Sequence, residues 1–345
     1  MNTQPETAPI EDTDTTTEST GTQWYETGPL LPGEGLPTAV TPKSVRPLRD
    51  YAGVIARSAE TLLSGSGAVL FRNFPVASVE DFEFVVRTVR RDLSTYDFGS
   101  TPRSQVQNQI YTSTEYPPHQ SIPLHNEMAY TTEWPMKIWF YCAEASPEGG
   151  DTPIADSRRV FELIPPPIRD RFISKGVMYV RNYGNGLDVP WEKVFNTTDR
   201  KTVEAFCRQN GILYEWKEDG ELRTKQIAQA VAVHPQTGES VWFNQAHLFH
   251  ISNLEMLVRE ALLCAVSEED LPRNAYFGDG SPIETETLDE VRDVYRRTAV
   301  RFPWCKGDVL MLDNMLTAHG RMPFKGPRRI LVAMAEPYGA QHPCR

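Results

Sequence analysis

Two histidines and one glutamate of this chain have the types and spacing that could hold a metal ion. His125 and Glu127 stand two residues apart, and residues i and i+2 of an extended segment point to the same side. His319 lies six residues after a second apolar run, 308–313. Two imidazoles and one carboxylate on one face of an octahedral ion form the facial triad typical of non-haem Fe(II) oxygenases.

A single histidine–glutamate pair at this spacing is a weak signal, because it occurs by chance in many chains. Two further features strengthen it. Arg329 lies ten residues after His319 and opens an apolar strand, where a buried guanidinium needs an anionic partner. Thr152 lies 27 residues after His125, in a Gly-Gly-Asp-Thr segment.

In combination these motifs resemble the taurine-dioxygenase-like (TauD/TfdA) superfamily of Fe(II)/2-oxoglutarate-dependent dioxygenases. The resemblance covers residues 45–340 in order and spacing, through His-Asn-Glu at 125–127, Gly-Gly-Asp-Thr at 149–152, His-Gly-Arg at 319–321 and Arg-Arg-Ile at 328–330. Segments 111–117 and 242–244 resemble the members that hydroxylate amino acids in natural-product and antibiotic biosynthesis. The family fold is a double-stranded β-helix, or jelly roll.

The resemblance implies a role for each matching residue. His125, Glu127 and His319 would ligate Fe(II), and Thr152 would donate its hydroxyl to the cosubstrate 2-oxoglutarate. Arg329 would form a bidentate salt bridge with the distal carboxylate of 2-oxoglutarate, a task that suits a planar guanidinium.

The neighbouring Arg328 is the alternative for this arginine role. We prefer Arg329, because the family's arginine directly precedes the apolar strand, as Arg329 precedes Ile330. The period of two along a strand predicts that the two arginines face opposite ways.

The implied reaction consumes O2 and 2-oxoglutarate and hydroxylates an unactivated C–H bond of a small substrate, an amino acid or its derivative, free or presented on a carrier protein. Glu127 favours hydroxylation over halogenation, because related halogenases lack the carboxylate. Ala333 stands where a sulfonate-binding arginine is expected, which disfavours taurine-like substrates. Two alternatives stay open: desaturation or cyclisation at the same iron, and a non-redox cupin-like module that binds a metal or ligand.

The elements that position these residues are mostly short strands. Apolar runs predict strands at 68–74, 136–143, 308–313 and 329–335, and a hairpin is predicted at 213–225 with its turn at 219–220. Helices are predicted over 48–63, after Ser78, and after a capping-box pattern at Thr287 and Glu290. This pattern favours a mainly β sandwich or barrel with helical insertions.

Composition narrows the function further. The chain has 345 residues, 35 basic against 46 acidic side chains and a net charge of −11, which argues against nucleic acid or anionic lipid as the main partner. We expect residues 1–42 to be an acidic, disordered tail, because seven acids precede the first base, Lys43. Residues 43–345 would form one jelly-roll domain.

No apolar run is long enough to span a membrane, and residues 1–22 do not resemble a signal peptide. The five scattered cysteines indicate reduced thiols and hence a cytoplasmic protein. The sequence leaves the oligomeric state open.

Overall fold

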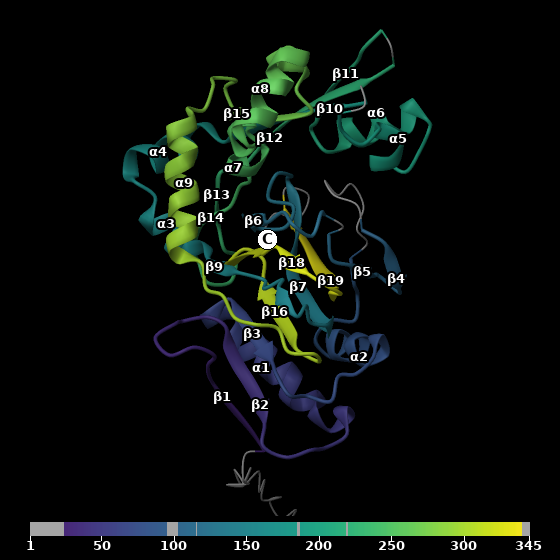
Figure 1. Cartoon of the computed structure of the whole chain (residues 1–345), viewed down its shortest axis with the longest axis vertical. Coiled ribbons are helices and arrows are strands. Elements are labelled where there is room, and N and C mark those ends of the chain that lie inside the picture. The colour runs from purple at the N-terminus through teal and green to yellow at the C-terminus, as the bar shows by residue number, and fades with distance from the viewer. Residues whose placement is uncertain (1–23, 95–102, 115, 185–186, 219, 340–345) are drawn as a thin grey trace, which may run out of the picture.

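The computed structural model describes residues 24–94, 103–114, 116–184, 187–218 and 220–339. Sheets dominate, and helices pack around them (Figure 1). The largest sheet has eight strands in the order β1–β2–β3–β16–β7–β19–β5–β4. Their bounds are β1 Tyr25–Pro29, β2 Thr38–Pro42, β3 Ala68–Phe71, β4 Gln105–Gln107, β5 Ile110–Thr112, β7 Glu133–Glu144, β16 Val309–Asp313 and β19 Arg329–Gly339.

The two faces of this sheet are buried against different parts of the molecule. Helices α1 (Ala52–Ser66) and α2 (Val79–Val89) cover one face around Phe82 and Trp139, which are fully buried. Ser78 begins α2 with a capping box: its hydroxyl accepts from the Asp81 N–H while the Asp81 carboxylate accepts from the Ser78 N–H. The other face carries alternate residues of the same strands into a second core.

A small three-stranded sheet carries the histidines of the predicted triad. Its order is β6–β17–β9, with β6 at Ile122–His125, β17 at Thr317–Arg321 and β9 at Ile154–Asp156. A separate two-stranded sheet pairs β8 (Glu148–Gly149) with β18 (Phe324–Lys325). In the sequence, β8 directly precedes β9 and β18 directly follows β17.

A four-stranded sheet, β11–β12–β10–β15, lies above these elements in Figure 1. Its bounds are β10 Val177–Tyr183, β11 Leu213–Trp216, β12 Leu222–Ala228 and β15 Arg273–Phe277, and a separate hairpin joins β13 Val231–Val233 to β14 Ser240–Trp242. The helices of this half are α3 Ser157–Leu163, α4 Pro166–Lys175, α5 Trp191–Val194, α6 Arg200–Gln209, α7 Ala246–Phe249, α8 Met256–Ala265 and α9 Thr285–Thr298, with 3-10 turns at Ile251–Asn253 and Glu268–Asp270. A further 3-10 turn, Leu48–Tyr51, directly precedes α1.

The boundary predicted for the tail is wrong. Strands β1 and β2 lie inside the segment 1–42, and β2 pairs in parallel with β3, where Val40 is fully buried. These two strands are rich in threonine, proline and glycine and have few apolar residues, so the sequence gives no apolar run that would predict them. Residues 1–23 lie outside the described part of the chain.

The predicted start of the late helix is also wrong. Helix α9 begins at Thr285 with Glu284 as its N-cap, and Thr287 lies inside the first turn, where its hydroxyl contacts the Glu284 carboxylate. Among the described residues, no helix combines the length and the apolar character that crossing a membrane requires.

Candidate metal centre and cosubstrate cavity

The antiparallel pairing of β6 with β17 brings His125 and His319 face to face. They are direct Cα partners in this register, and their ring centroids lie 4.6 Å apart. A register shift follows between His319 and Arg321. The two predicted imidazole ligands, 194 residues apart in the sequence, are thus placed by one pair of short strands.

Glu127 lies just beyond the end of β6, in the turn that follows it. Its backbone N–H donates to Asn314 Oδ1 at 2.7 Å, and Asn314 Nδ2 donates to the Glu127 carbonyl at 2.9 Å. These two hydrogen bonds hold the backbone of Glu127 against Asn314, the residue that follows β16. Its carboxylate Oε2 consequently lies 3.7 Å from His319 Nε2.

The three side chains form one cluster in which a ligand atom of each lies within 4.8 Å of the others. Burial lowers the pKa of His125, although the nearby Glu127 carboxylate opposes this effect. Burial, and then the charges of His125 and Arg103, lower the pKa of His319 well below its usual range. Both imidazoles are therefore neutral at pH 7, as metal ligation requires.

The donor set fits a divalent metal ion. His125 Nδ1 lies 2.8 Å from the Pro123 carbonyl, so Nδ1 carries the proton and Nε2 has its lone pair available. The buried Glu127 carboxylate is met by Arg103, whose Nη2 lies 2.6 Å from Oε2. Two neutral imidazoles and one carboxylate are the ligands that Fe(II) takes in a facial triad.

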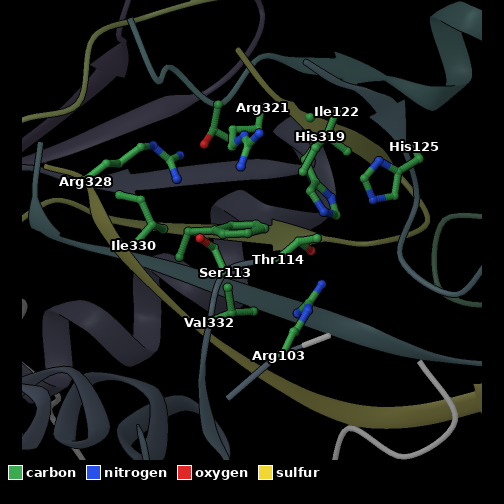
Figure 2. Close-up of a pocket in the computed structure, with 13 residues that line it drawn as sticks. Arg103, Ser113, Thr114, Ile122, His125, His319, Arg321, Arg328, Ile330 and Val332 are labelled. Carbon is green, nitrogen blue, oxygen red and sulfur yellow. The ribbon is translucent and has the colours of Figure 1, made fainter. Parts of the chain in front are cut away.

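A cavity extends from the two histidines to Arg328, which Figure 2 shows at the opposite end of the view. Phe140, Ile330 and Val332 line its apolar wall, and Thr152 is a further lining residue. The cavity therefore combines a metal-ligand set, an apolar wall and a cation.

Thr152 lines the cavity as the sequence predicts. It is 3% exposed, and its Oγ1 accepts a hydrogen bond of 3.1 Å from Trp304 Nε1. Because a hydroxyl both accepts and donates, this contact leaves the Thr152 proton free to be given to a ligand.

The placement predicted for Arg329 is wrong. Arg329 is exposed, whereas Arg328 lines the cavity together with Ile330 and Val332. Arg328 directly precedes β19 and lines the cavity, whereas Arg329, the first residue of β19, is turned to solvent. The register of β19 shifts between Arg329 and Ile330, and Leu331 belongs to the core beneath α1 and α2.

Arg328 is held by one hydrogen bond of 2.9 Å from Nε to the Gly150 carbonyl. Burial, then the charge of Arg321, lower the pKa of Arg328 to about 10, so that it remains a cation at pH 7. Gly150 has a φ of +79°, and a Cβ there would lie 3.0 Å from the Arg328 side chain. The Gly-Gly segment therefore makes room for the guanidinium.

Sequence reasoning missed three polar residues around the centre. Arg321 donates to the carbonyls of Tyr116, Pro117 and Gln120 and so fixes that loop beside the cavity. Asn314 and Arg103 contact Glu127 directly. Arg321 belongs to the His-Gly-Arg motif, and Asn314 follows the apolar strand. Neither feature of the sequence indicates which groups these two side chains contact.

Two histidines without a predicted role, His247 and His234, have structural contacts. His247 Nε2 donates to the Leu124 carbonyl at 2.9 Å, and burial lowers the pKa of His247 to about 3. His234 Nε2 lies 3.2 Å from the Asp313 carboxylate, which also accepts from Lys137. No second metal cluster occurs within the described ranges.

Comparison with known proteins connects this geometry with one family. The family model described as "Taurine catabolism dioxygenase TauD, TfdA family" matches residues 36–334. The chain is similar to the dapdiamide synthesis protein DdaC of Enterobacter agglomerans, with 42% identity over 81% of this chain and 84% of that protein.

Two further similarities are more distant. A clavaminate synthase-like protein of Arabidopsis thaliana is 34% identical over 80% of this chain and 84% of its own length. The crystal structure of the PvcB protein from Pseudomonas aeruginosa aligns with a TM-score of 0.52 at 16% identity, covering 96% of this chain and 94% of that one.

Proposed function

Because the chain belongs to the TauD/TfdA family and is an Fe(II)/2-oxoglutarate-dependent dioxygenase, we propose that it hydroxylates an unactivated C–H bond of an amino acid or amino-acid derivative in natural-product biosynthesis. The buried cluster of His125, Glu127 and His319 beside a cavity with a cation at its far end carries this proposal. The similarity to a dapdiamide synthesis protein supports the biosynthetic setting.

His125, Glu127 and His319 would hold the iron. Iron bound there would activate O2, which is the oxidant, and 2-oxoglutarate would be oxidised to succinate and CO2 as the substrate is hydroxylated. Asn314 orients the Glu127 backbone, and the Pro123 carbonyl holds His125 in the tautomer with a free Nε2. The apolar wall around Phe140 excludes water from this end of the cavity.

Arg328 would bind the distal carboxylate of 2-oxoglutarate in place of the predicted Arg329. Among the described residues its Nε donates to Gly150, and the two Nη groups are left for a bidentate contact with a carboxylate. Thr152 would donate its hydroxyl to the same carboxylate, since Trp304 occupies only its acceptor side.

The residues of the site also bear on three alternatives: halogenation, a sulfonate substrate, and desaturation or cyclisation. The buried Glu127 carboxylate occupies the ligand position that a halogenase would leave to chloride. Four residues beyond Arg328 stands Val332, and four beyond Arg329 stands Ala333, so that neither register supplies a cation for a sulfonate. Desaturation or cyclisation would use the same groups and differ in the pose of the substrate.

We also propose the finer fold expected from the resemblance, a double-stranded β-helix. Antiparallel β16, β7, β19 and β5 on one side and β6, β17 and β9 on the other support it. A cytoplasmic location is supported by the four described cysteines, which are free thiols. Carrier-protein presentation and self-association remain proposals that mass photometry and acyl-carrier assays would test.

The experiment is a coupled succinate assay with Fe(II), O2 and 2-oxoglutarate across a panel of free L-amino acids and their N-acyl derivatives, followed by mass analysis of the products. We expect a succinate signal with at least one compound and a product heavier by one oxygen atom. The Glu127→Ala variant is the control for background oxidation. A product that has lost two hydrogens, or gained chlorine, would contradict hydroxylation.

A further inference from the structure

A second cavity lies on one face of strands β10 and β12, separate from the cavity that holds Arg328. Its walls carry Arg181 from β10 and the polar side chains Thr224 and Gln226 from β12, with tyrosines on either side. Thr224 is the direct Cα partner of Arg181 across the two strands. The cavity is therefore built on regular, hydrogen-bonded backbone.

Arg181 is a buried cation without a hydrogen bond. Its side chain is 4% exposed, and Nε, Nη1 and Nη2 all lack a partner among the described residues. It stacks on the ring of Tyr183, with the guanidinium carbon 4.6 Å from the ring centroid. A buried guanidinium left in this state costs stability, because its donors have lost water without gaining acceptors.

The nearest carboxylate is already engaged by another arginine. Asp188 accepts two hydrogen bonds of 3.0 Å from Arg273, and its Oδ2 lies 3.8 Å from Arg181 Nη2, too far for a hydrogen bond. The Arg273 contacts, with the charge of Arg181, lower the pKa of Asp188 against the opposing effect of burial. Two cations thus share one anion, and one positive charge is uncompensated within the described residues.

This cavity is linked to the metal-binding segment by two routes. Tyr130 lines the cavity and stands three residues after Glu127 in the same turn. Tyr179 also lines it, and its hydroxyl accepts the Gln245 N–H, while Gln245 Nε2 donates to the Asn126 carbonyl. Three Cα steps span at most about 11 Å, so that the wall of the cavity lies within a small molecule's length of Glu127.

We propose that Arg181 binds the carboxylate of the substrate, and that the substrate is therefore a carboxylic acid. This inference rests on the proposed function, because it assumes that a small molecule is oxidised at the neighbouring metal centre. The planar guanidinium matches a carboxylate in shape, and one uncompensated positive charge matches one negative charge. Thr224 and Gln226 add neutral hydrogen-bonding groups beside Arg181, and Tyr130 and Tyr179 line the same cavity.

The test compares acids with their carboxamides. The probes are the L-amino acids and their N-acyl derivatives, each as free acid and as primary amide, measured by succinate formation and by thermal stabilisation of the protein. With the wild type we expect the acid of an active pair to bind about 10- to 100-fold more tightly than the amide, the range for a charge-assisted hydrogen bond.

The Arg181→Met variant should lose this preference. We expect its apparent KM for the acid to rise by about 10- to 100-fold while its KM for the amide and its kcat at saturation change little. Arg181→Lys keeps the charge and should recover part of the preference. Arg200→Met, which removes an exposed arginine from helix α6 of the same half, is the matched control and should behave as the wild type.

The melting temperature without ligand distinguishes a binding role from a structural one. Arg181→Met removes a buried charge that has no hydrogen bond within the described residues, and Asp188 keeps its ion pair with Arg273, so the melting temperature should equal or exceed that of the wild type. A clear loss of melting temperature, or no preference for acids over amides in the wild type, would overturn the carboxylate site. Absence of any 2-oxoglutarate turnover in the wild type would instead overturn the proposed function.

Discussion

A shift of one residue decides which arginine faces the cavity. The sequence predicts that Arg328 and Arg329 point to opposite sides of one strand; in the structure Arg328 precedes β19 and lines the cavity, while Arg329 begins the strand and is exposed. The sequence does not reveal which face of β19 is turned to the cavity, since apolar residues follow on both faces. That choice is made by helices α1 and α2, which cover the face of Leu331 and leave the face of Ile330 to the cavity.

We predict that Arg328→Ala raises the KM for 2-oxoglutarate by about two orders of magnitude, because a buried carboxylate would lose its charged partner. Arg328→Lys should also be costly, since an ammonium cannot reproduce the bidentate contact. Titration of 2-oxoglutarate in the succinate assay measures both. Arg329→Ala is the matched control with a small expected effect; the opposite ranking would restore the original assignment.

Asn314 shows what a list of ligands leaves out. Its amide holds the Glu127 backbone from both sides and also reaches the Pro135 carbonyl at 2.8 Å. We predict that Asn314→Ala weakens Mn(II) binding by about 10- to 100-fold in a calorimetric titration. Asn274→Ala removes an equally buried asparagine from β15 and should lower stability alone. Equal metal affinity in both variants would show that Asn314 does not position Glu127.

At the scale of elements, the sequence predicts the long apolar strands best. The runs that became β3 and β16 are fully buried, those that became β7 and β19 are buried except towards their ends, and Ser78 marks the start of α2 correctly. The hairpin of β11 and β12 is also confirmed. These elements have strong local signals, because their side chains face a core on both sides or their caps are local contacts.

Elements with mixed composition were not predicted. Strand β10 contains Arg181 and Asn182, and the exposed helix α8 has no buried side chain. The metal centre itself depends on the register of β6 with β17 and on a turn that places Glu127. Such pairings are set by contacts between residues far apart in the chain, so that a motif can name the ligands without giving their geometry.

Helix α7 links the site to the pH dependence of folding through His247. In the folded protein the pKa of His247 is lowered to about 3 by burial, while in the unfolded chain it lies near 6.5. The unfolded state therefore takes up a proton first as the pH falls below about 6.5, and the folded state loses stability relative to it until about pH 3.

Between pH 7.5 and pH 5 this histidine should account for about 2 kcal/mol of the loss in free energy of unfolding. His247→Gln keeps a donor for the Leu124 carbonyl and removes the titration, so its urea-unfolding profile should be flatter by that amount. His119→Gln replaces an exposed histidine and should retain the wild-type profile. An unchanged slope in His247→Gln would contradict the burial argument.

At the scale of the whole molecule, the eight-stranded sheet begins earlier in the chain than composition indicates. Strands β1 and β2 extend it beyond β3, and Leu36 and Val40 are buried there. The excess of acidic residues in the first 42 positions therefore does not mark where the folded part of the chain begins. The parallel pairing of β2 with β3 shows that the folded part begins before residue 43, and no local sequence pattern predicts this pairing.

Two truncations should behave differently. Removal of residues 1–22, which are poor in apolar side chains, should change the melting temperature by no more than about 1 °C. Removal of residues 1–42 deletes two strands and uncovers the edge of β3, and it should lower the melting temperature by at least about 5 °C. Differential scanning calorimetry compares them, and equal stability of both truncated proteins would contradict the role of β2.

The most direct test of the account is 2-oxoglutarate-dependent succinate formation by His319→Ala, with Mn(II) affinity measured on the same sample. His319 and His125 are paired across β17 and β6 and complete the ligand cluster with Glu127. Removing one of three protein ligands should abolish succinate formation and weaken Mn(II) binding by at least about 100-fold, while the melting temperature of the metal-free protein stays near that of the wild type. Wild-type turnover and metal affinity in His319→Ala would contradict the assignment of this cluster as the iron site.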